Sequence, residues 1–189
     1  QTLFADPGFD ATPVARLAAA AGVPKGLVFH YFPSKLALLV ALVEERGRLD
    51  EFAADPVPAV PGDAAATLER VAGRFRAAHP AAAAVRHIAF RESRAHPAVR
   101  GCLTRLTLAA ERHVRAALDA ALGVADRSAR PARDAAAAAF AAALLHDLTL
   151  QELVGRSLDL SGIARVVAAG LQSASGVAGL PSAPGATGQ

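Results

Sequence analysis

Hydrophobic residues recur every three or four positions along most of the chain, in segments that glycine and proline separate. This period is typical of amphipathic helices. Near the start of the chain it predicts a helix over Pro13 to Ala21, a turn at Gly22 and a second short helix over Pro24 to Phe32. The two helices are expected to share a small core that contains Val14, Leu17, Ala18, Ala21, Val23, Val28 and Phe32.

Capping and turn residues indicate where these helices begin and end. Thr12 is a predicted N-cap, followed by a proline at the first helical position, and Ser34 is placed to cap the next helix. Gly8 lies where a preceding helix is expected to stop, since glycine often follows the last helical residue. The segment from Thr2 to Asp6 has the pattern of the end of that helix.

The remainder of the chain also has a helical pattern. A longer helix is expected from Ser34 to Phe52, followed by a proline-rich break from Asp55 to Gly62 (DPVPAVPG). Further helices are predicted at Asp63 to His79, Ala81 to Arg94, Leu103 to Gly123, Arg133 to Val154 and Leu160 to Ser173. We therefore expect an all-α protein with a head (residues 1–46), a helical body (47–173) and a flexible tail (174–189).

Composition narrows the fold class and the compartment. Hydrophobic residues make up 53% and aromatic residues 5% of the 189, which favours helices because strands are enriched in β-branched and aromatic residues. Cys102 is the only cysteine, which excludes an internal disulfide and fits the cytoplasm. The longest apolar run, Ala135 to Leu145, is shorter than the ~20 residues of a membrane span. Gln1 and the absence of methionine predict further residues upstream, and no signal peptide is visible.

The distribution of charge suggests an anionic partner. The formal net charge is +3, and the only two lysines, Lys25 and Lys35, lie with Arg16 in residues 11–43, a stretch without acidic residues. Two short helices around a glycine turn form a helix-turn-helix, in which the first helix braces the second in the DNA major groove. The sequence therefore predicts DNA binding. The alternative interpretation is an ordinary solvated helix surface.

Four motifs in register strengthen this prediction. They are LF-x-x-x-GF, T-x-V-x-x-L-A, AGV-x-KG and YF-x-SK, all between Leu3 and Leu42. This segment resembles the DNA-binding domain of the TetR family of bacterial transcriptional repressors. The resemblance implies a homodimer whose subunits each have a three-helix DNA-binding head and an all-helical body for ligand binding and dimerisation.

The resemblance also implies which residues contact DNA: Thr12, Pro13, Arg16, Lys25, Gly26, Leu27, His30, Tyr31 and Lys35. The residues nearest the bases would be Lys25, Gly26, Leu27 and His30. Tyr31 and Lys35 would contact phosphates, and Thr12 and Pro13 would contact the DNA backbone. The sequence departs from the family pattern twice. Pro24 replaces a serine that usually caps the recognition helix, and Phe29 replaces a tyrosine whose hydroxyl reaches a phosphate, which puts phosphate affinity in doubt.

The body contains a helix suited to a subunit interface. Phe140, Leu144 and Leu148 form an apolar stripe at positions i, i+4 and i+8, among small residues that allow close helix packing. The resemblance places the dimer contact on the last two long helices, which include this stripe. The alternative is that the stripe belongs to the core of a single chain.

Arginine is concentrated in the body. Residues 67–115 contain ten arginines and three glutamates, a local net charge of +7. This pattern is consistent with an acidic ligand or, as we prefer, with solvated side chains on alanine-rich helices. Candidate ligand-binding residues are the polar groups and neighbouring wall residues of these helices, namely His87, Phe90, Arg91, Cys102, Thr107, His113, His146 and Thr149.

Other classes of protein find less support. The sequence contains no HExxH, GxSxG, Walker or dinucleotide-binding motif, and its histidines lack the spacing of a metal site, so neither an enzyme nor a cofactor is predicted. We predict a repressor that binds palindromic operator DNA as a homodimer and is released by a small-molecule effector. The alternative is a helical small-molecule-binding or DNA-binding protein without operator specificity.

Overall fold

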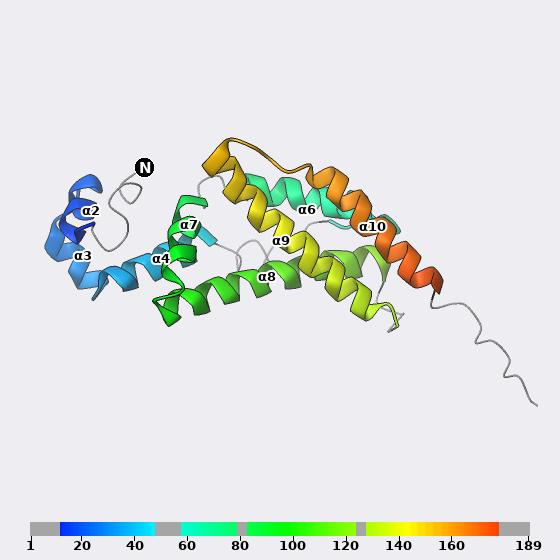
Figure 1. The fold of residues 1–189 in the computed structure, drawn as a ribbon, viewed down its shortest axis with the longest axis horizontal. Helices are drawn as coiled ribbons and strands as arrows, with labels where there is room; N and C mark the ends of the chain where they lie inside the picture. The colour runs from blue at the N-terminus through cyan, green and yellow to red at the C-terminus, as the bar shows by residue number, and fades with distance from the viewer. Residues whose placement is uncertain (1–11, 48–57, 79–82, 124–127, 178–189) are drawn as a thin grey trace, which may run out of the picture.

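The computed structural model describes residues 12–47, 58–78, 83–123 and 128–177, and these residues form helices without strands (Figure 1). The all-α prediction is therefore confirmed for this part of the chain. Its helices are α2 (Val14–Ala20), α3 (Lys25–Tyr31), α4 (Lys35–Gly47), α6 (Ala64–Ala78), α7 (Ala83–Glu92), α8 (Pro97–Leu122), α9 (Arg130–Val154) and α10 (Leu160–Val177).

The turn between α2 and α3 is set by Gly22. Its φ is +69°, and the backbone N–H groups of Gly22 and Val23 donate to Ala19 O and Ala18 O at 3.1 and 3.0 Å. This is the Schellman arrangement, which satisfies the last carbonyls of a helix and requires a left-handed residue, usually glycine. The turn brings α3 back against α2, as the sequence predicted. Ala18 is buried in their shared core, whereas the predicted core residue Ala21 is exposed.

Helices α6, α8, α9 and α10 form a bundle that holds the main core (Figure 1). Its interior is made of leucine, valine, phenylalanine and many alanines, whose small side chains let the helices approach closely. The largest buried side chains include Phe75 of α6, Leu118 of α8 and Phe140 of α9. Of these three residues, Phe140 belongs to the apolar stripe that the helical period indicated.

A second core joins the head to the body. Leu39 and Val43 of α4 are buried against Ala89 of α7 and against Val99 and Cys102 of α8. Outside this core, the Arg105 guanidinium of α8 binds the Glu44 carboxylate of α4 at 2.6 Å. Helix α4 therefore starts at the head and is fixed along its length to the first half of α8, as Figure 1 shows.

The stripe of Phe140, Leu144 and Leu148 lies inside the main core, not at a subunit interface. Their exposed fractions are 0, 1 and 4% in a single chain, so a partner cannot reach them. The interface prediction is therefore wrong for these three residues. Periodicity identified a buried face correctly, but α6, α8 and α10 of the same chain cover it.

Several helix boundaries differ from the predicted ones. Helix α8 begins at Pro97 and α9 at Arg130, because a proline is tolerated in the first turn, where its missing N–H has no helical partner. Helix α10 runs to Val177, so residues 174–177 are helical and were wrongly assigned to the predicted tail. The predicted segment from Thr2 to Asp6, the end of the helix to Phe52 and residues 178–189 lie outside the described part.

An ion pair with a buried carboxylate connects α6, α9 and the loop before α10. The Arg76 guanidinium donates to both carboxylate oxygens of Asp147, at 2.8 and 3.0 Å, and also to Leu158 O at 3.0 Å. The Leu158 N–H in turn donates to Asp147 Oδ1 at 2.6 Å. Asp147 has no exposed surface, so its charge depends on these partners.

Candidate nucleic-acid interface

Helix α3 presents most of its side chains to solvent. Among the predicted base-contacting residues, Lys25, Gly26 and His30 are exposed, and Leu27 is 44% exposed. Tyr31 is 68% exposed. Its ring lies edge-on to the His30 ring, with 5.1 Å between the two ring centroids. A short helix with so little buried surface is held mainly by α2 and by the turn at its start, which leaves its outer face available to a partner.

The bracing helix contributes a smaller part of this surface. Pro13 and Arg16 are exposed, as a contact with the DNA backbone requires. Lys35 is half-buried, and its Nζ donates to Thr12 O at 3.4 Å. Thr12 itself is completely buried, so its side chain lies inside the head and the prediction of a Thr12 contact with DNA is wrong. Pro13, not Thr12, is the N-cap of α2.

The two departures from the family pattern have structural consequences. Pro24 is the N-cap of α3 and makes no side-chain capping bond, as expected, whereas Ser34 Oγ accepts from Ala37 N at 3.0 Å at the start of α4. Phe29 is 43% exposed, and the Lys25 ammonium lies 5.7 Å from its ring centroid. Phe29 was not among the DNA-contacting residues predicted from the sequence. Its spacing of four residues from Lys25, one helical turn, was the available signal.

The candidate ligand-binding residues do not form one site. His87, Phe90, Arg91, Thr107 and His146 are exposed on different helices, and Phe90 is 63% exposed. Thr149 is half-buried and its hydroxyl donates to Leu145 O of its own helix at 3.2 Å. Cys102 and His113 are buried, Cys102 in the joint with α4 and His113 in the bundle. None of the eight candidates lines the groove described below, and ligand binding by them stays a prediction.

A groove lies elsewhere on the body. Its volume is about 310 Å³, and its walls come from α8 and α9, namely Leu108, Glu111, Arg112, Arg115, Asp134 and Ala137. An ion pair of 3.3 Å joins Arg115 to Asp134 within it. Within the described ranges, no group of three His, Cys, Asp or Glu side chains is placed to hold a metal ion.

Burial changes the chemistry of the two interior candidates. Desolvation raises the pKa of the Cys102 thiol, and the nearby Glu44 carboxylate adds to this effect, so the thiol stays protonated and is a poor nucleophile. Desolvation, with the Arg74 guanidinium as a smaller cause, lowers the pKa of His113. Both residues are therefore favoured in their neutral forms.

Stability is expected to depend on pH through His113. The unfolded chain takes up a proton near the ordinary pKa of about 6.5, whereas folded His113 does so only at lower pH. Stability contributed by neutral His113 is thus present above this pH and is lost as the pH falls towards the folded pKa. Urea midpoints at pH 8 and 5.5 should therefore differ less in His113→Leu than in the wild type.

The exposed His87 provides the control for this measurement. His87→Leu should keep the wild-type difference between the two pH values, because His87 lies on the surface of α7. An equal pH dependence in His113→Leu and wild type would show that other groups cause it.

The exposed recognition surface, the braced α2–α3 pair and the absence of acids in residues 11–43 define a helix-turn-helix DNA-binding protein. Residues 2–42 match the family described as bacterial regulatory proteins, tetR family. This segment is therefore similar to the DNA-binding domain of TetR family transcriptional regulators, which supports DNA binding by the head. The match covers the head, and searches of curated proteins and of solved structures found no match to the chain.

No single helix of the described residues is long and apolar enough to cross a bilayer. Helices α3 and α4 reach that length only as a pair bent by 73°.

Proposed function

We propose that the protein is a homodimeric repressor that binds a palindromic operator and releases it when a small molecule binds the body. The observation that best supports sequence-specific binding is the exposed outer face of α3, where Lys25, Gly26, Leu27 and His30 are open to solvent. Side chains on one face of a braced recognition helix can reach base edges in the major groove. Two such heads in a dimer read two half-sites.

The dimer contact is proposed on the outer surfaces of α9 and α10. With the Phe140 stripe inside the core, the opposite face of α9 carries the exposed small residues Ala135, Ala139 and Ala142. On α10, Val166 is 74% exposed, and Ala169 beside it is also exposed. Small and apolar side chains on two neighbouring helices favour close packing against a second pair. Light scattering at micromolar concentration should give the mass of a dimer, and a monomer would contradict the proposal.

Release is proposed to act through α4. This helix carries the head at one end and is packed into the core of α4, α7 and α8, with the Glu44–Arg105 ion pair beside it. A ligand that binds the body more tightly in one arrangement of α7 and α8 would shift the population of head positions. An effector that binds the body and leaves operator affinity unchanged would contradict this mechanism.

The first test is a selection of genomic fragments with the purified protein at about physiological salt. A repressor should enrich one palindromic motif near a few promoters. Binding of all fragments alike, with a strong dependence on salt, would instead support a DNA-binding protein without operator specificity. The enriched motif then supplies the operator for the measurements that follow.

Lys25→Ala and Tyr31→Phe should affect DNA binding differently. Lys25→Ala should weaken operator binding by about 1–3 kcal/mol and weaken random DNA less, because a base contact supplies discrimination. Tyr31→Phe should weaken both by about 1 kcal/mol, since its hydroxyl is proposed to bind a phosphate. Fluorescence anisotropy with operator and scrambled duplexes measures both. Equal losses for Lys25→Ala on the two duplexes would contradict its role.

A further inference from the structure

The turn between α7 and α8 carries an exposed basic surface that the functions above do not use. Arg91, Arg94 and Arg100 are all exposed, and Phe90 beside them is 63% exposed. We refer to these four residues as the basic strip. Phe90 and Arg91 lie three and four residues after His87, so all three share one side of α7, and Arg94 follows in the turn after this helix.

Few negative charges oppose this strip. Glu92 is the only acid between residues 83 and 104; it is half-buried, and its carboxylate lies 3.8 Å from His96 Nε2. Arg105, the next arginine along α8, already binds Glu44 at 2.6 Å. The strip therefore presents three guanidinium groups to solvent without a neutralising exposed carboxylate from its own segment.

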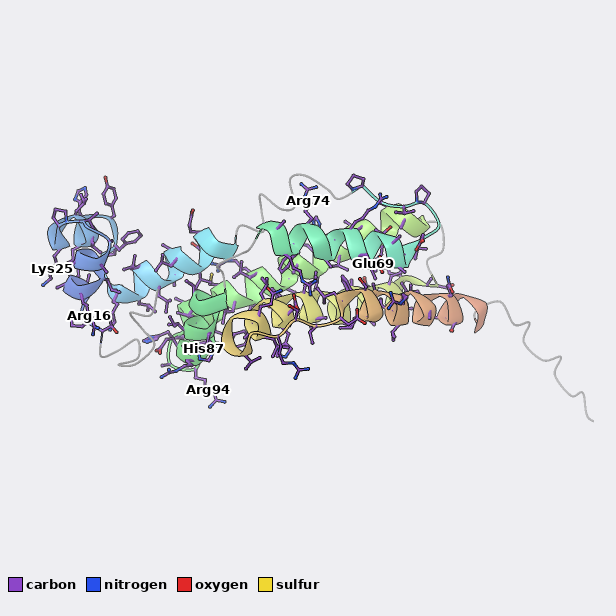
Figure 2. All side chains as sticks on the ribbon, turned by 90° about the horizontal axis from the view of Figure 1, so that it is seen from above. Arg16, Lys25, Glu69, Arg74, His87 and Arg94 are labelled. Atoms are coloured by element: carbon purple, nitrogen blue, oxygen red, sulfur yellow. The ribbon has the colours of Figure 1, made fainter. Side chains whose placement is uncertain are left out.

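The strip lies at the end of the body that is nearest the head. Val99, which directly precedes Arg100, is buried in the same core as Leu39, and Leu36 from the first turn of α4 packs against that core. In Figure 2, His87 and Arg94 lie in the half of the molecule that contains the head, and Arg94 and Arg16 lie along the same edge of that view. Residues 12–43, which form the head and most of α4, contain no acid, so they add no negative charge beside the strip.

We propose that the basic strip is a second DNA contact, which binds backbone phosphates next to the site read by the head. The inference rests on DNA binding by the head, because the head brings the strip close to the duplex. Guanidinium groups bind phosphate oxygens through paired N–H donors, and Phe90 offers an apolar contact for deoxyribose. Such a contact adds affinity and salt dependence but no sequence preference.

The test is the salt dependence of binding to a mixed-sequence 40-base-pair duplex, measured by anisotropy for the full chain. Each phosphate contact contributes about 0.9 to the slope of log affinity against log salt. The triple variant Arg91→Ala/Arg94→Ala/Arg100→Ala should lower this slope by about 2.7. When the salt concentration rises from 50 to 200 mM, the fold-loss of affinity should therefore be about 40 times smaller for this variant than for the wild type.

Two variants control for net charge and for folding. Arg112→Ala/Arg130→Ala/Arg165→Ala removes three exposed charges further along the bundle and should keep the wild-type slope. Arg91→Lys/Arg94→Lys/Arg100→Lys keeps the charge of the strip and should keep most of the slope. Circular dichroism of each variant shows whether the helices are intact.

The outcomes separate this inference from the proposed function. A wild-type slope in the alanine variant of the strip, with intact DNA binding, would overturn the inference alone. A wild-type slope together with a lower mass in light scattering would also overturn it and would assign the strip to a contact between copies. If the wild-type protein bound neither this duplex nor any selected fragment, DNA binding by the head and the inference would both be wrong.

Discussion

Replacing Arg76 with methionine is expected to lower the free energy of unfolding by about 3 kcal/mol at pH 7. Asp147 has no exposed surface, and Arg76 supplies two of its hydrogen bonds and its counter-charge. Removing one partner of a buried ion pair leaves the other charge uncompensated, which costs about 3–5 kcal/mol. We expect the lower end because the Arg76 side chain is 35% exposed. Urea denaturation followed by circular dichroism measures the change.

Two further variants test whether the uncompensated charge is the cause. Arg76→Met/Asp147→Asn should be more stable than Arg76→Met, because the amide oxygen can still accept from Leu158 N–H without a buried charge. Arg165→Met removes an exposed ion pair with Glu69, at 3.6 Å, and should cost less than about 1 kcal/mol. If the double variant were less stable than Arg76→Met, the loss of stability in Arg76→Met would have to come from lost packing and not from the uncompensated Asp147 charge.

The Arg76–Asp147 pair also predicts that Arg76→Met reverses how this carboxylate makes stability depend on pH. In the wild type, burial alone would raise the pKa of Asp147, but the hydrogen bonds from Arg76 and Leu158 and the charge of Arg76 together hold it below its usual value. Its stabilising contribution is therefore present above the unfolded pKa of about 3.9 and is lost as the pH falls through the folded value. In Arg76→Met, burial should raise this pKa, so the variant should recover stability relative to wild type between pH 7 and 5.

The head was the part of the fold best predicted from sequence. Its local signals act within a few residues: Gly22 adopts the positive φ that its turn requires, and Ser34 caps α4. The prolines were harder to interpret. The sequence predicted helices beginning at Leu103 and Arg133, but Pro97 and Pro131 each lie in the first turn of a longer helix. A proline breaks a helix only where its N–H would have a helical partner, and sequence alone does not say which turn it occupies.

For a related reason, the sequence predicted the exposed residues of α3 better than the ligand-binding residues. The exposed residues of α3 follow from a short motif, so Lys25, His30 and Tyr31 lie on the surface as expected. The ligand candidates depend on how distant helices pack, and a single polar residue does not reveal its neighbours. His113 and His87 are one type of residue on alanine-rich helices, yet one is buried and the other exposed. The Glu44–Arg105 pair was missed because it joins positions 61 residues apart.

Phe140→Ala is expected to lower the free energy of unfolding by about 3–5 kcal/mol, the range found when a buried phenylalanine is truncated. Phe140 has no exposed surface and packs in the core of α6, α8, α9 and α10 within one chain. The loss comes from removed apolar contacts and the cavity left behind, so it should be the same at low and high protein concentration. Urea denaturation at two concentrations tenfold apart measures it.

Val166→Glu is the matched change on the surface of the bundle. Val166 is 74% exposed on α10, on the face proposed to contact a second subunit, so a charge there should weaken association while leaving the core intact. Light scattering over a dilution series should show dissociation at a higher concentration for Val166→Glu than for the wild type. A folded Phe140→Leu variant should dissociate as the wild type does, because its side chain lies inside the chain. If Phe140→Leu promoted dissociation and Val166→Glu did not, the result would show that the Phe140 stripe belongs to the subunit interface.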